Sequence, residues 1–510
     1  MKRASQLLSK TKYIIGLQCP RLVWVEVHEP GRIPETDPVT QYIFDQGHLV
    51  GELAKKLFPD GTDISTEDFM GNINMTKELL KERKPLFEAG ILAGNLYSRV
   101  DILPPTGEGE WDIVEVKSST SVKDVHINDV AFQRYCCNQS GLNIRKCYLA
   151  LINNHYVRDG EIDPKGLFNI HDVTVQVEEA SVGIQDRIDG ILEVVGQETC
   201  PEMIIGPHCR DPYECPLTDC WDSLPENNVF TLYYGGKKSF EMYNNGIVTI
   251  DEIPDDYKLS DKQRIQQACV SSGEPYIDRE AIYGFLSSLE YPLHYLDFET
   301  ISPAVPLFDG VRPYQNIPFQ FSLHVVRDEF SQPEHFSFLA SGADDPRPAF
   351  ITNLKKVIGE TGSIVVYNAG FETAVLTELT KTLSISGVEY KDWRGVLTVN
   401  TQPVSQHSEW LEGIVERIVD LLTPFRNFYY YHPLQKGSNS LKAVLPAITG
   451  RGYEDLDISD GQIASLSFLS ATFGDMPRTE RAQVMANLEE YCGRDTEGML
   501  WIVKKLRELI

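Results

Sequence analysis

The sequence lacks two features that would place it at once in a broad class. It has no run of 18 or more apolar residues, which excludes a helix that spans a membrane. It also has few cations: 47 Lys and Arg stand against 74 Asp and Glu, for a net charge of −27. A nucleic-acid enzyme of this charge must concentrate its cations locally, or use metal ions to bridge its acids to phosphate.

The first residues also lack the apolar core of a signal peptide. The basic start Met1-Lys2-Arg3 is followed by polar residues that leave only Leu7-Leu8 between them. We therefore expect a cytoplasmic protein, in which ten cysteines argue against a disulfide framework. Four of the cysteines lie between residues 200 and 220 without a C-x-x-C spacing, which fits a zinc ribbon poorly and favours another metal or iron–sulfur site.

The 510 residues predict about three domains on length alone and permit two large ones. Alternating strand and helix patterns indicate an α/β protein. In the second half we expect strands at 293–300, 319–327, 334–340 and 363–367, with helices at 348–359, 371–382 and 411–424. We also expect a strand over 229–234, and a helix opened by a polar cap at Ser438–Lys442.

Two carboxylates mark the end of the strand at 293–300. Because side chains alternate along a strand, Asp297 and Glu299 point to the same face. Two neighbouring acids on a core strand are costly unless something pairs them, and a divalent cation prefers carboxylate oxygens. The alternative is a strand end with two solvated acids.

Two later stretches favour the metal hypothesis. Val365-Val366-Tyr367-Asn368-Ala369-Gly370-Phe371-Glu372 is an apolar strand that breaks into a helix. Tyr491 and Asp495 lie four residues apart in the last helix and so share a helical face. Together with D-x-E, these motifs resemble the DEDD exonucleases of the RNase H-like superfamily, the DnaQ-type fold, over about residues 286–510.

The resemblance implies four acids that hold two Mg²⁺ or Mn²⁺ ions, with a tyrosine that orients the attacking water. The acids would be Asp297, Glu299, Glu372 and Asp495, Tyr491 would orient the water, and Asn368 is a candidate substrate-binding residue. Glu372 departs from the family, which usually has Asp at this position. Asp420 resembles an aspartate that follows the second motif, and a structural role for it is the alternative.

A second acidic constellation lies in the first half of the chain. Strands at 96–103 and 111–119 flank a turn, and a hairpin would bring Asp101 beside Glu115 and Lys117. Asp and Glu hold a metal in such a trio, while Lys positions or activates a water near a phosphate. The alternative is an exposed cross-strand salt bridge. A helix over 41–58, with Phe44, Leu49, Leu53 and Leu57 spaced for one face, carries His48.

The region from about residue 10 to 222 resembles the RecB/AddB-type PD-(D/E)XK nucleases. The resemblance implies a metal site of His48, Asp101, Glu115 and Lys117, with Gln133 and Tyr135 as candidate substrate-binding residues. It also implies a 4Fe–4S cluster held by Cys19, Cys209, Cys215 and Cys220, with Cys200 as a fifth candidate and zinc as the alternative metal. Cys137 stands where the family often has Tyr.

The whole arrangement resembles a bacterial family that fuses a RecB-like nuclease domain to a DnaQ-like exonuclease domain. We expect a restriction-endonuclease-like PD-(D/E)XK domain over 1–222, a connecting segment over 223–285, and an RNase H-like mixed-sheet domain over 286–510. The expected function is metal-dependent hydrolysis of DNA or RNA, with no membrane partner. The alternative is a nucleic-acid-binding or scaffold protein in which one or both sites are degenerate.

Overall fold

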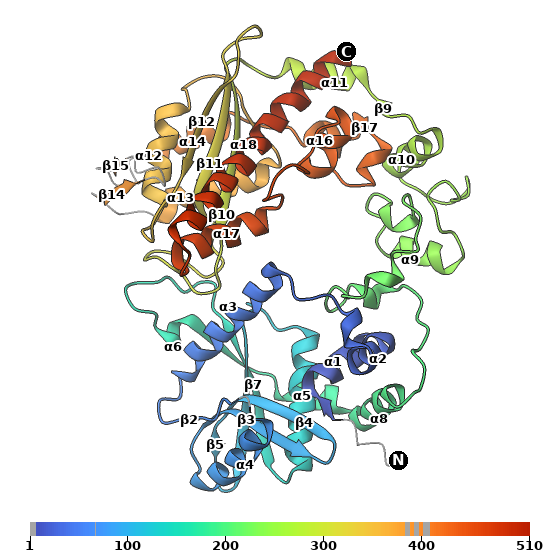
Figure 1. Cartoon of the computed structure of the whole chain (residues 1–510), viewed down its shortest axis with the longest axis vertical. Coiled ribbons are helices and arrows are strands. Elements are labelled where there is room, and N and C mark those ends of the chain that lie inside the picture. Colours follow the sequence, from blue (N-terminus) through green and yellow to red (C-terminus); the bar gives the residue numbers. More distant parts are fainter. Residues whose placement is uncertain (1–6, 67, 383–387, 392–396, 401–407) are drawn as a thin grey trace. The chain divides into compact units, whose positions relative to one another are not determined.

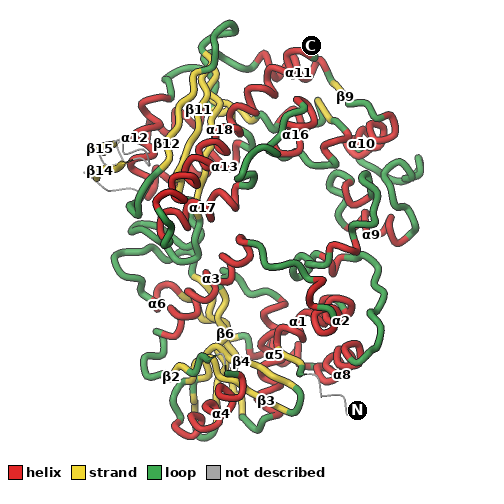
Figure 2. Tube along the Cα trace, in the orientation of Figure 1, coloured by secondary structure: helices red, strands yellow, loops and turns green. Residues whose placement is uncertain are grey.

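The structure is a computed structural model that describes residues 7–66, 68–382, 388–391, 397–400 and 408–510. Met1-Lys2-Arg3, which contribute to the signal-peptide expectation, lie outside these residues. The chain divides into two units. The N-terminal unit comprises Met1–Ser223 with Pro303–Tyr314, and the C-terminal unit comprises Leu224–Ser302 with Gln315–Ile510. Both units are mixed α/β structures (Figure 2).

The N-terminal unit is built on a curled mixed sheet with the strand order β2-β3-β4-β6-β7-β8 (Figure 1). Strand β4 runs antiparallel to β6, and β6 runs parallel to β7, with the crossover helix α5 packed against the sheet. The strands are β1 (Leu8–Ser9), β2 (Thr62–Asp63), β3 (Leu86–Ala93), β4 (Leu96–Leu103), β5 (Pro105–Thr106), β6 (Glu110–Lys117), β7 (Asn143–Ile152) and β8 (Phe168–Asp172).

The helices of this unit cover an apolar core in which Tyr13 stacks on Phe132. Helix α3 begins after Asp37, whose carboxylate accepts from the amides of Val39 and Thr40. The helices are α1 (Lys10–Gln18), α2 (Pro20–His28), α3 (Pro38–Lys55), α4 (Phe69–Leu79), α5 (Asp124–Gln139), α6 (Pro164–Leu167), α7 (Thr174–Ser181) and α8 (Ile184–Val195).

The prediction that one apolar face of α3 is buried is only half correct. Leu53 is buried, together with Val50 and Ala54, against apolar side chains of the sheet. Phe44 and Leu49 are 52% and 44% exposed. The difference arises because only the C-terminal part of the helix supplies buried residues, so the periodic pattern extends beyond the packed segment.

The C-terminal unit contains a five-stranded mixed sheet with the order β12-β11-β10-β13-β16. Strands β12, β11 and β10 are antiparallel neighbours, whereas β10, β13 and β16 run parallel. The strands of the unit are β9 (Tyr276–Ile277), β10 (Leu293–Ile301), β11 (Ile317–Val326), β12 (Glu334–Leu339), β13 (Ile364–Val366), β14 (Val388–Lys391), β15 (Leu397–Asn400), β16 (Ile418–Asp420) and β17 (Tyr430–Tyr431).

Helices α12 and α18 cover opposite faces of β11. Phe321 packs on Phe350 of α12, whereas the next residue along the strand, Ser322, hydrogen bonds to Thr496 of α18. Figure 1 shows α12, β11 and α18 in the C-terminal unit. The helices of the unit are α9 (Lys237–Asn244), α10 (Asp261–Ser272), α11 (Arg279–Ser287), α12 (Arg347–Val357), α13 (Ala369–Thr382), α14 (Ser408–Glu416), α15 (Thr423–Arg426), α16 (Leu441–Thr449), α17 (Gly461–Phe473) and α18 (Arg478–Glu508).

Three expected elements differ from the structure. Residues 229–234 contain a short 3-10 helix, Val229–Thr231, instead of a strand. The helix expected over 411–424 ends at Glu416, because Ile418–Asp420 pairs with β13 as β16. Helix α16 begins at Leu441 after Ser440, whose side chain makes no capping hydrogen bond among the described residues.

Candidate functional site

The strand β10 places Asp297 and Glu299 on the face of the sheet that α18 covers. Asp297 lies opposite Ser322, and Glu299 lies opposite Gln320. Gln320 donates to the carbonyl of Leu488 on α18 at 2.8 Å, so this row of polar side chains faces the helix. The expectation that the two acids share a face is therefore confirmed.

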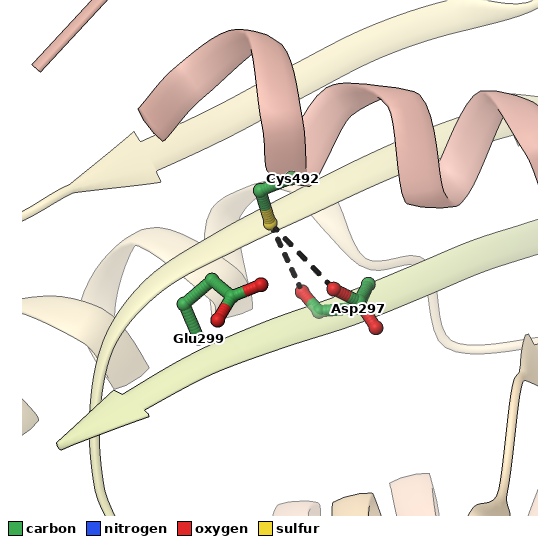
Figure 3. A group of neighbouring side chains, drawn as sticks. All are labelled: Asp297, Glu299 and Cys492. Carbon is green, nitrogen blue, oxygen red and sulfur yellow. Dashed lines mark hydrogen bonds between the residues drawn. The ribbon is translucent and has the colours of Figure 1, made fainter. Parts of the chain in front are cut away.

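Helix α18 brings Cys492 and Asp495 to these acids. One ligand atom each from Asp297, Glu299 and Cys492 lies within 4.8 Å of the other two (Figure 3). The Cys492 sulfur is 3.8 Å from Oδ2 of Asp297. Asp495 lies on the same helix and accepts a hydrogen bond from the Tyr453 hydroxyl. The structure thus joins the first and last motifs, which are almost 200 residues apart in the sequence.

Glu372 comes from the first turn of α13, just after β13 ends. The preceding turn contains Asn368, whose backbone adopts a left-handed φ of 72°. The Glu372 side chain is 2% exposed, and its Oε2 has no hydrogen-bond partner among the residues that the structure describes. Burial, with a smaller contribution from Asp420, raises the pKa of Glu372 to about 8. A buried carboxyl of this kind is costly to ionise without a cation.

Asp297 is repelled by the other three acids. Burial and the charges of Asp495, Glu299 and Glu372 raise the pKa of Asp297 well above its ordinary value. Burial and Asp495 likewise raise the pKa of Glu299. Because desolvation and neighbouring like charges both penalise the ionised form, the cluster is short of positive charge.

Lys442 on α16 lowers the pKa of both Glu299 and Asp495, so it offsets part of this repulsion. Its Nζ is 3.0 Å from Oδ2 of Asp460 and lies 5.7 Å from the centroid of the Tyr491 ring. Arg494 also lowers the pKa of Asp495, but Lys442 and Arg494 each pair with another aspartate and so do not balance the four carboxyls. The donor set is dominated by oxygen, as Mg²⁺ and Mn²⁺ prefer, and Cys492 adds one soft sulfur at its edge.

The site opens towards solvent at Asp297, which is partly exposed, whereas Glu299 and Asp495 are each 7% exposed. Burial raises the pKa of the Tyr491 hydroxyl, with Asp495 as the next cause, so this tyrosine stays protonated. Asp420 has a structural role: its Oδ1 accepts from the amides of Asn368 and Leu422, both at 3.0 Å.

The acids of the N-terminal unit have a different environment. Both Lys10 and Lys117 donate to Oε1 of Glu115, at 2.8 and 2.7 Å. Gln133 donates to Oε2 of the same carboxylate at 2.6 Å, and Lys117 also donates to Asp129 at 2.7 Å. Burial alone would raise the pKa of Glu115, but the two lysines outweigh it and hold the pKa below its ordinary value.

Asp101 lies beside this network, as the expected hairpin implies. Its Oδ2 accepts from the amide of Val116 at 2.8 Å, and burial together with Glu115 raises its pKa to about 7. Asp101 and His48 line a pocket of about 440 Å³ with Lys10 and Arg99. The structure therefore brings His48, Asp101, Glu115 and Lys117 into one neighbourhood, but lysines occupy the contacts of Glu115 that a metal would take.

Sequence reasoning missed five residues of the two sites: Lys10, Asp129, Lys442, Tyr453 and Cys492. Asp129 could have been found, because it lies four residues before Gln133 on α5 and so shares its helical face. Tyr135 points elsewhere, since its hydroxyl contacts Gln185 on α8. Cys137 is fully buried in the core and does not take part in the site.

The expected cluster cysteines lie in one neighbourhood of the N-terminal unit. Cys19 belongs to an apolar cluster against which Cys215 and Cys200 pack. Burial raises the pKa of Cys215 to about 11, and the nearby thiols of Cys19, Cys209 and Cys220 act in the same direction. The separate segments therefore do converge, and Cys200 packs beside them.

The thiol spacing can be compared with the spacing that a zinc ion requires. Zinc, with Zn–S distances of about 2.3 Å, would bring its sulfurs to about 3.8 Å from one another. Among the described residues, no three of these sulfurs lie within 4.8 Å of one another. The donor chemistry fits an iron–sulfur cluster, which is larger than a single ion and accepts four thiolates.

One comparison with known proteins matches part of the C-terminal unit. A family model described as a domain of unknown function, DUF2779, matches residues 294–440. The match includes Asp297, Glu299, Glu372 and Asp420 and ends before Asp495. The description states no activity.

Two relatives from mycoplasmas are similar to part of the chain. The "Uncharacterized protein MG366 homolog" of Mycoplasma pneumoniae is 27% identical over 233 residues, which cover 42% of this chain and 32% of the relative. "Uncharacterized protein MG366" of Mycoplasma genitalium is 28% identical over 234 residues, with the same coverage. The matched part of the chain thus spans about a third of the length of either relative.

A solved structure titled "Crystal structure of SSO0001" covers 37% of this chain and 78% of its own, with 13% identity and a TM-score of 0.20. That score is too low to support an argument about fold. Within the part of the chain that the structure describes, no helix has the length and apolar character needed to traverse a bilayer.

Proposed function

We propose that the C-terminal unit hydrolyses phosphodiester bonds of DNA or RNA with Mg²⁺ or Mn²⁺ held by Asp297, Glu299, Glu372 and Asp495. The observation that carries the proposal is the convergence of four poorly compensated carboxyls from β10, α13 and α18. When bound, the metals activate a water and stabilise the charge that develops on the phosphate. The five-stranded mixed sheet supports an RNase H-like assignment of this unit.

The protein's own side chains have separate roles in this reaction. Tyr491 lies beside Glu299 and Asp495, and its hydroxyl stays protonated, so it orients a water by hydrogen bonding instead of acting as a base. Lys442 adds positive charge at the same edge and counters the repulsion between the acids and a phosphate. Partial exposure of Asp297 leaves the site open to substrate.

The test uses the full chain and end-labelled single- and double-stranded DNA and RNA with Mg²⁺ or Mn²⁺. We expect digestion from the 3′ end by the native protein, and a loss of more than about 100-fold in Asp297→Ala. Asp475→Ala is the matched control, because Asp475 is an exposed acid of the same unit. Absence of digestion with every substrate, or equal rates in native protein and Asp297→Ala, would contradict the proposal.

Glu372 departs from the aspartate that the DEDD resemblance implies, and Glu372→Asp tests whether this matters. The Oε2 atom of Glu372 has no hydrogen-bond partner among the described residues, which supports a role for this carboxyl as a ligand. A loss of activity in Glu372→Asp would show that the site is built around the longer side chain. A gain would show that the native site is attenuated.

The N-terminal unit carries a second candidate nuclease site, and its curled mixed sheet supports a PD-(D/E)XK assignment. The observation that favours it is the pocket in which His48 and Asp101 lie near Glu115 and Lys117. A metal there would replace Lys10 or Lys117 as the partner of Glu115. In an Asp297→Ala background, any residual digestion that Lys117→Ala abolishes would come from this site. Residual digestion that survives Lys117→Ala would exclude this assignment.

We also propose that Cys19, Cys209, Cys215 and Cys220 hold a 4Fe–4S cluster. The carrying observation is that thiols from both ends of the N-terminal unit converge. Anaerobically purified protein should contain iron and sulfide and absorb in the charge-transfer region of iron–sulfur clusters. Cys209→Ala should lower both the iron content and the stability of the protein. Stoichiometric zinc without iron or sulfide would contradict the assignment.

The principal alternative is a nucleic-acid-binding or scaffold protein without activity. Glu115 already accepts hydrogen bonds from two lysines, which favours this alternative for the N-terminal unit only. Binding of nucleic acid by the native chain, without cleavage under any metal tested, would establish it for both units.

A further inference from the structure

A pocket of about 620 Å³ lies in the C-terminal unit, apart from the four acids. It sits where the parallel strands β13 and β16 end, at the edge of the sheet where α/β proteins commonly bind ligands. Its volume falls within the range of about 300–1,000 Å³ that is typical of ligand sites. Its walls combine aromatic rings, amides and a guanidinium: Tyr233, Tyr234, Tyr367, Asn368, Arg426 and Asn439.

Tyr234 is the unusual member of this set. Its side chain is 86% exposed although its ring packs edge-on against Tyr233, with 4.5 Å between the centroids. Its backbone also adopts a left-handed φ of 47°, a conformation that costs free energy for a residue other than glycine. A large aromatic ring that is exposed on a strained backbone gains little from folding, so its position points to a ligand.

The other walls of the pocket are rigid. The Tyr367 hydroxyl donates to the carbonyl of Asn439 at 2.7 Å, which ties the end of β13 to the segment before α16. Tyr233 is 9% exposed, and its amide donates to the buried Gln266 at 2.7 Å. The pocket is therefore preorganised on three separate segments of the same unit.

Two short chain segments connect the pocket residues to residues of the acidic site. Leu441 lines the pocket, and the next residue, Lys442, reaches the ring of Tyr491 in the acidic site. On the other side, Asn368 lines the pocket and lies four residues before Glu372 in the turn that opens α13. The pocket and the acids are therefore carried by neighbouring stretches of the same two segments.

We propose that this pocket holds one unpaired nucleotide of a single-stranded DNA or RNA substrate, with its base stacked on Tyr234. The inference rests on the proposed function of the acidic site and specifies its substrate as a single strand. Aromatic rings bind any base through its face, and asparagine amides hydrogen bond to its edge. A protein with a net charge of −27 gains little from attracting phosphate at long range, so stacking is the suitable means of holding the strand.

Arg426 supports the same ligand without making the pocket strongly basic. Its guanidinium is 3.2 Å from Asp420, and its side chain is 48% exposed. The pairing neutralises much of its charge, while the planar group remains suited to a base or sugar. Binding through stacking should consequently change little between about 50 and 200 mM salt, unlike binding through many phosphate contacts.

The test measures binding of short fluorescent single-stranded DNA and RNA by the full chain in the presence of a chelator. No metal is bound under these conditions, so the readout does not require catalysis. We expect Tyr234→Ala to weaken binding by about 5- to 150-fold, the loss typical of one stacked base. Tyr234→Phe keeps the ring and should bind like the native protein. Tyr283→Ala is the matched control, because Tyr283 is a 64% exposed tyrosine of the same unit outside the pocket.

Two results would overturn the proposal. One is failure of the native chain to bind any single strand, and the other is equal binding by the native protein, Tyr234→Ala and Tyr283→Ala. Competition by nucleoside 5′-monophosphates, but not by a blunt duplex, would support an unpaired nucleotide as the occupant. If Mn²⁺-dependent digestion persists while the pocket variants bind normally, the pocket assignment fails and the proposed function stands. If binding depends on Tyr234 but no metal supports digestion, the hydrolytic function fails and the pocket stands.

Discussion

The two acidic clusters of this protein have similar residues, but Glu115 in one and Asp297 in the other have opposite electrostatics. In the N-terminal unit, Lys10, Lys117 and Gln133 all donate to Glu115, whose pKa is held below its ordinary value. In the C-terminal unit, burial and like charges raise the pKa of Asp297 and Glu299. The difference shows that the number of acids in a motif does not indicate whether a site needs a metal; the cations around them do.

This comparison also indicates which of the two clusters is better suited to bind a metal ion. A carboxylate whose oxygens already accept from lysines gains little from a divalent ion, because the ion must first displace a partner. A group of carboxyls whose neighbouring cations already pair with other acids gains a large electrostatic stabilisation when an ion binds. The C-terminal cluster is therefore the better candidate for a resident metal centre, and four predictions test the contrast.

The largest effect on stability is expected at Glu115. Glu115→Gln removes the charge that pairs with Lys10 and Lys117, so it should destabilise the protein by about 2–4 kcal/mol, less than for fully buried ion pairs because both lysines are partly exposed. Chemical denaturation measures the change, and Glu108→Gln in the neighbouring exposed turn is the control. A stability equal to that of the control would show that the lysines do not compensate this acid.

The same kind of substitution should have the opposite effect on stability at Glu372. Its folded pKa of about 8 lies above the ordinary value of 4.5, so the unfolded chain ionises first as the pH rises. The contribution of this group to the free energy of unfolding is therefore complete below about pH 4.5, and it is lost as the pH rises from there to about 8. Without metal, Glu372→Gln should stabilise the protein by about 2–4 kcal/mol at pH 8 and by little at pH 5. Exposed Glu360→Gln is the control, and destabilisation at pH 8 would refute the assignment.

Metal addition should distinguish the clusters directly. At a concentration of about 100 times its dissociation constant, Mn²⁺ should stabilise the native chain by about 2.7 kcal/mol. Asp297→Ala should abolish most of this stabilisation, whereas Asp101→Asn should retain it. Calorimetry with and without Mn²⁺ measures both effects. Loss of the stabilisation in Asp101→Asn alone would reverse the comparison and place the metal in the N-terminal unit.

The smallest predicted effect concerns Tyr491. Tyr491→Phe removes a hydroxyl beside the acids without removing a charge, so digestion should slow by about tenfold while Mn²⁺ stabilises the variant normally. The rate and the melting temperature are measured on the same preparation. Loss of metal-dependent stabilisation in this variant would show that the tyrosine helps build the metal site instead of orienting water.

Strong periodic segments could be predicted from the sequence, and short ones could not. The strand containing Asp297 and Glu299, the strand β4 and the strand β6 all lie close to their expected bounds. Residues 229–234 and 418–420 were assigned to the wrong type of element. Short apolar runs fit both helix and strand, and the choice at Ile418–Asp420 depends on a free edge of β13 that exists only in the folded sheet.

The sequence by itself determined which acids share a face, because strand and helix periodicity are local properties. It therefore predicted that Asp297 and Glu299 share a face of a strand, and that Tyr491 and Asp495 share a face of a helix. Only the tertiary structure decided which cations accompany these acids. Lys10 reaches Glu115 across 105 residues, and Lys442 reaches the other cluster from α16. Charge compensation depends on distance and burial, which no local pattern records, so the contrast between a compensated and an uncompensated site emerges only when the chain folds.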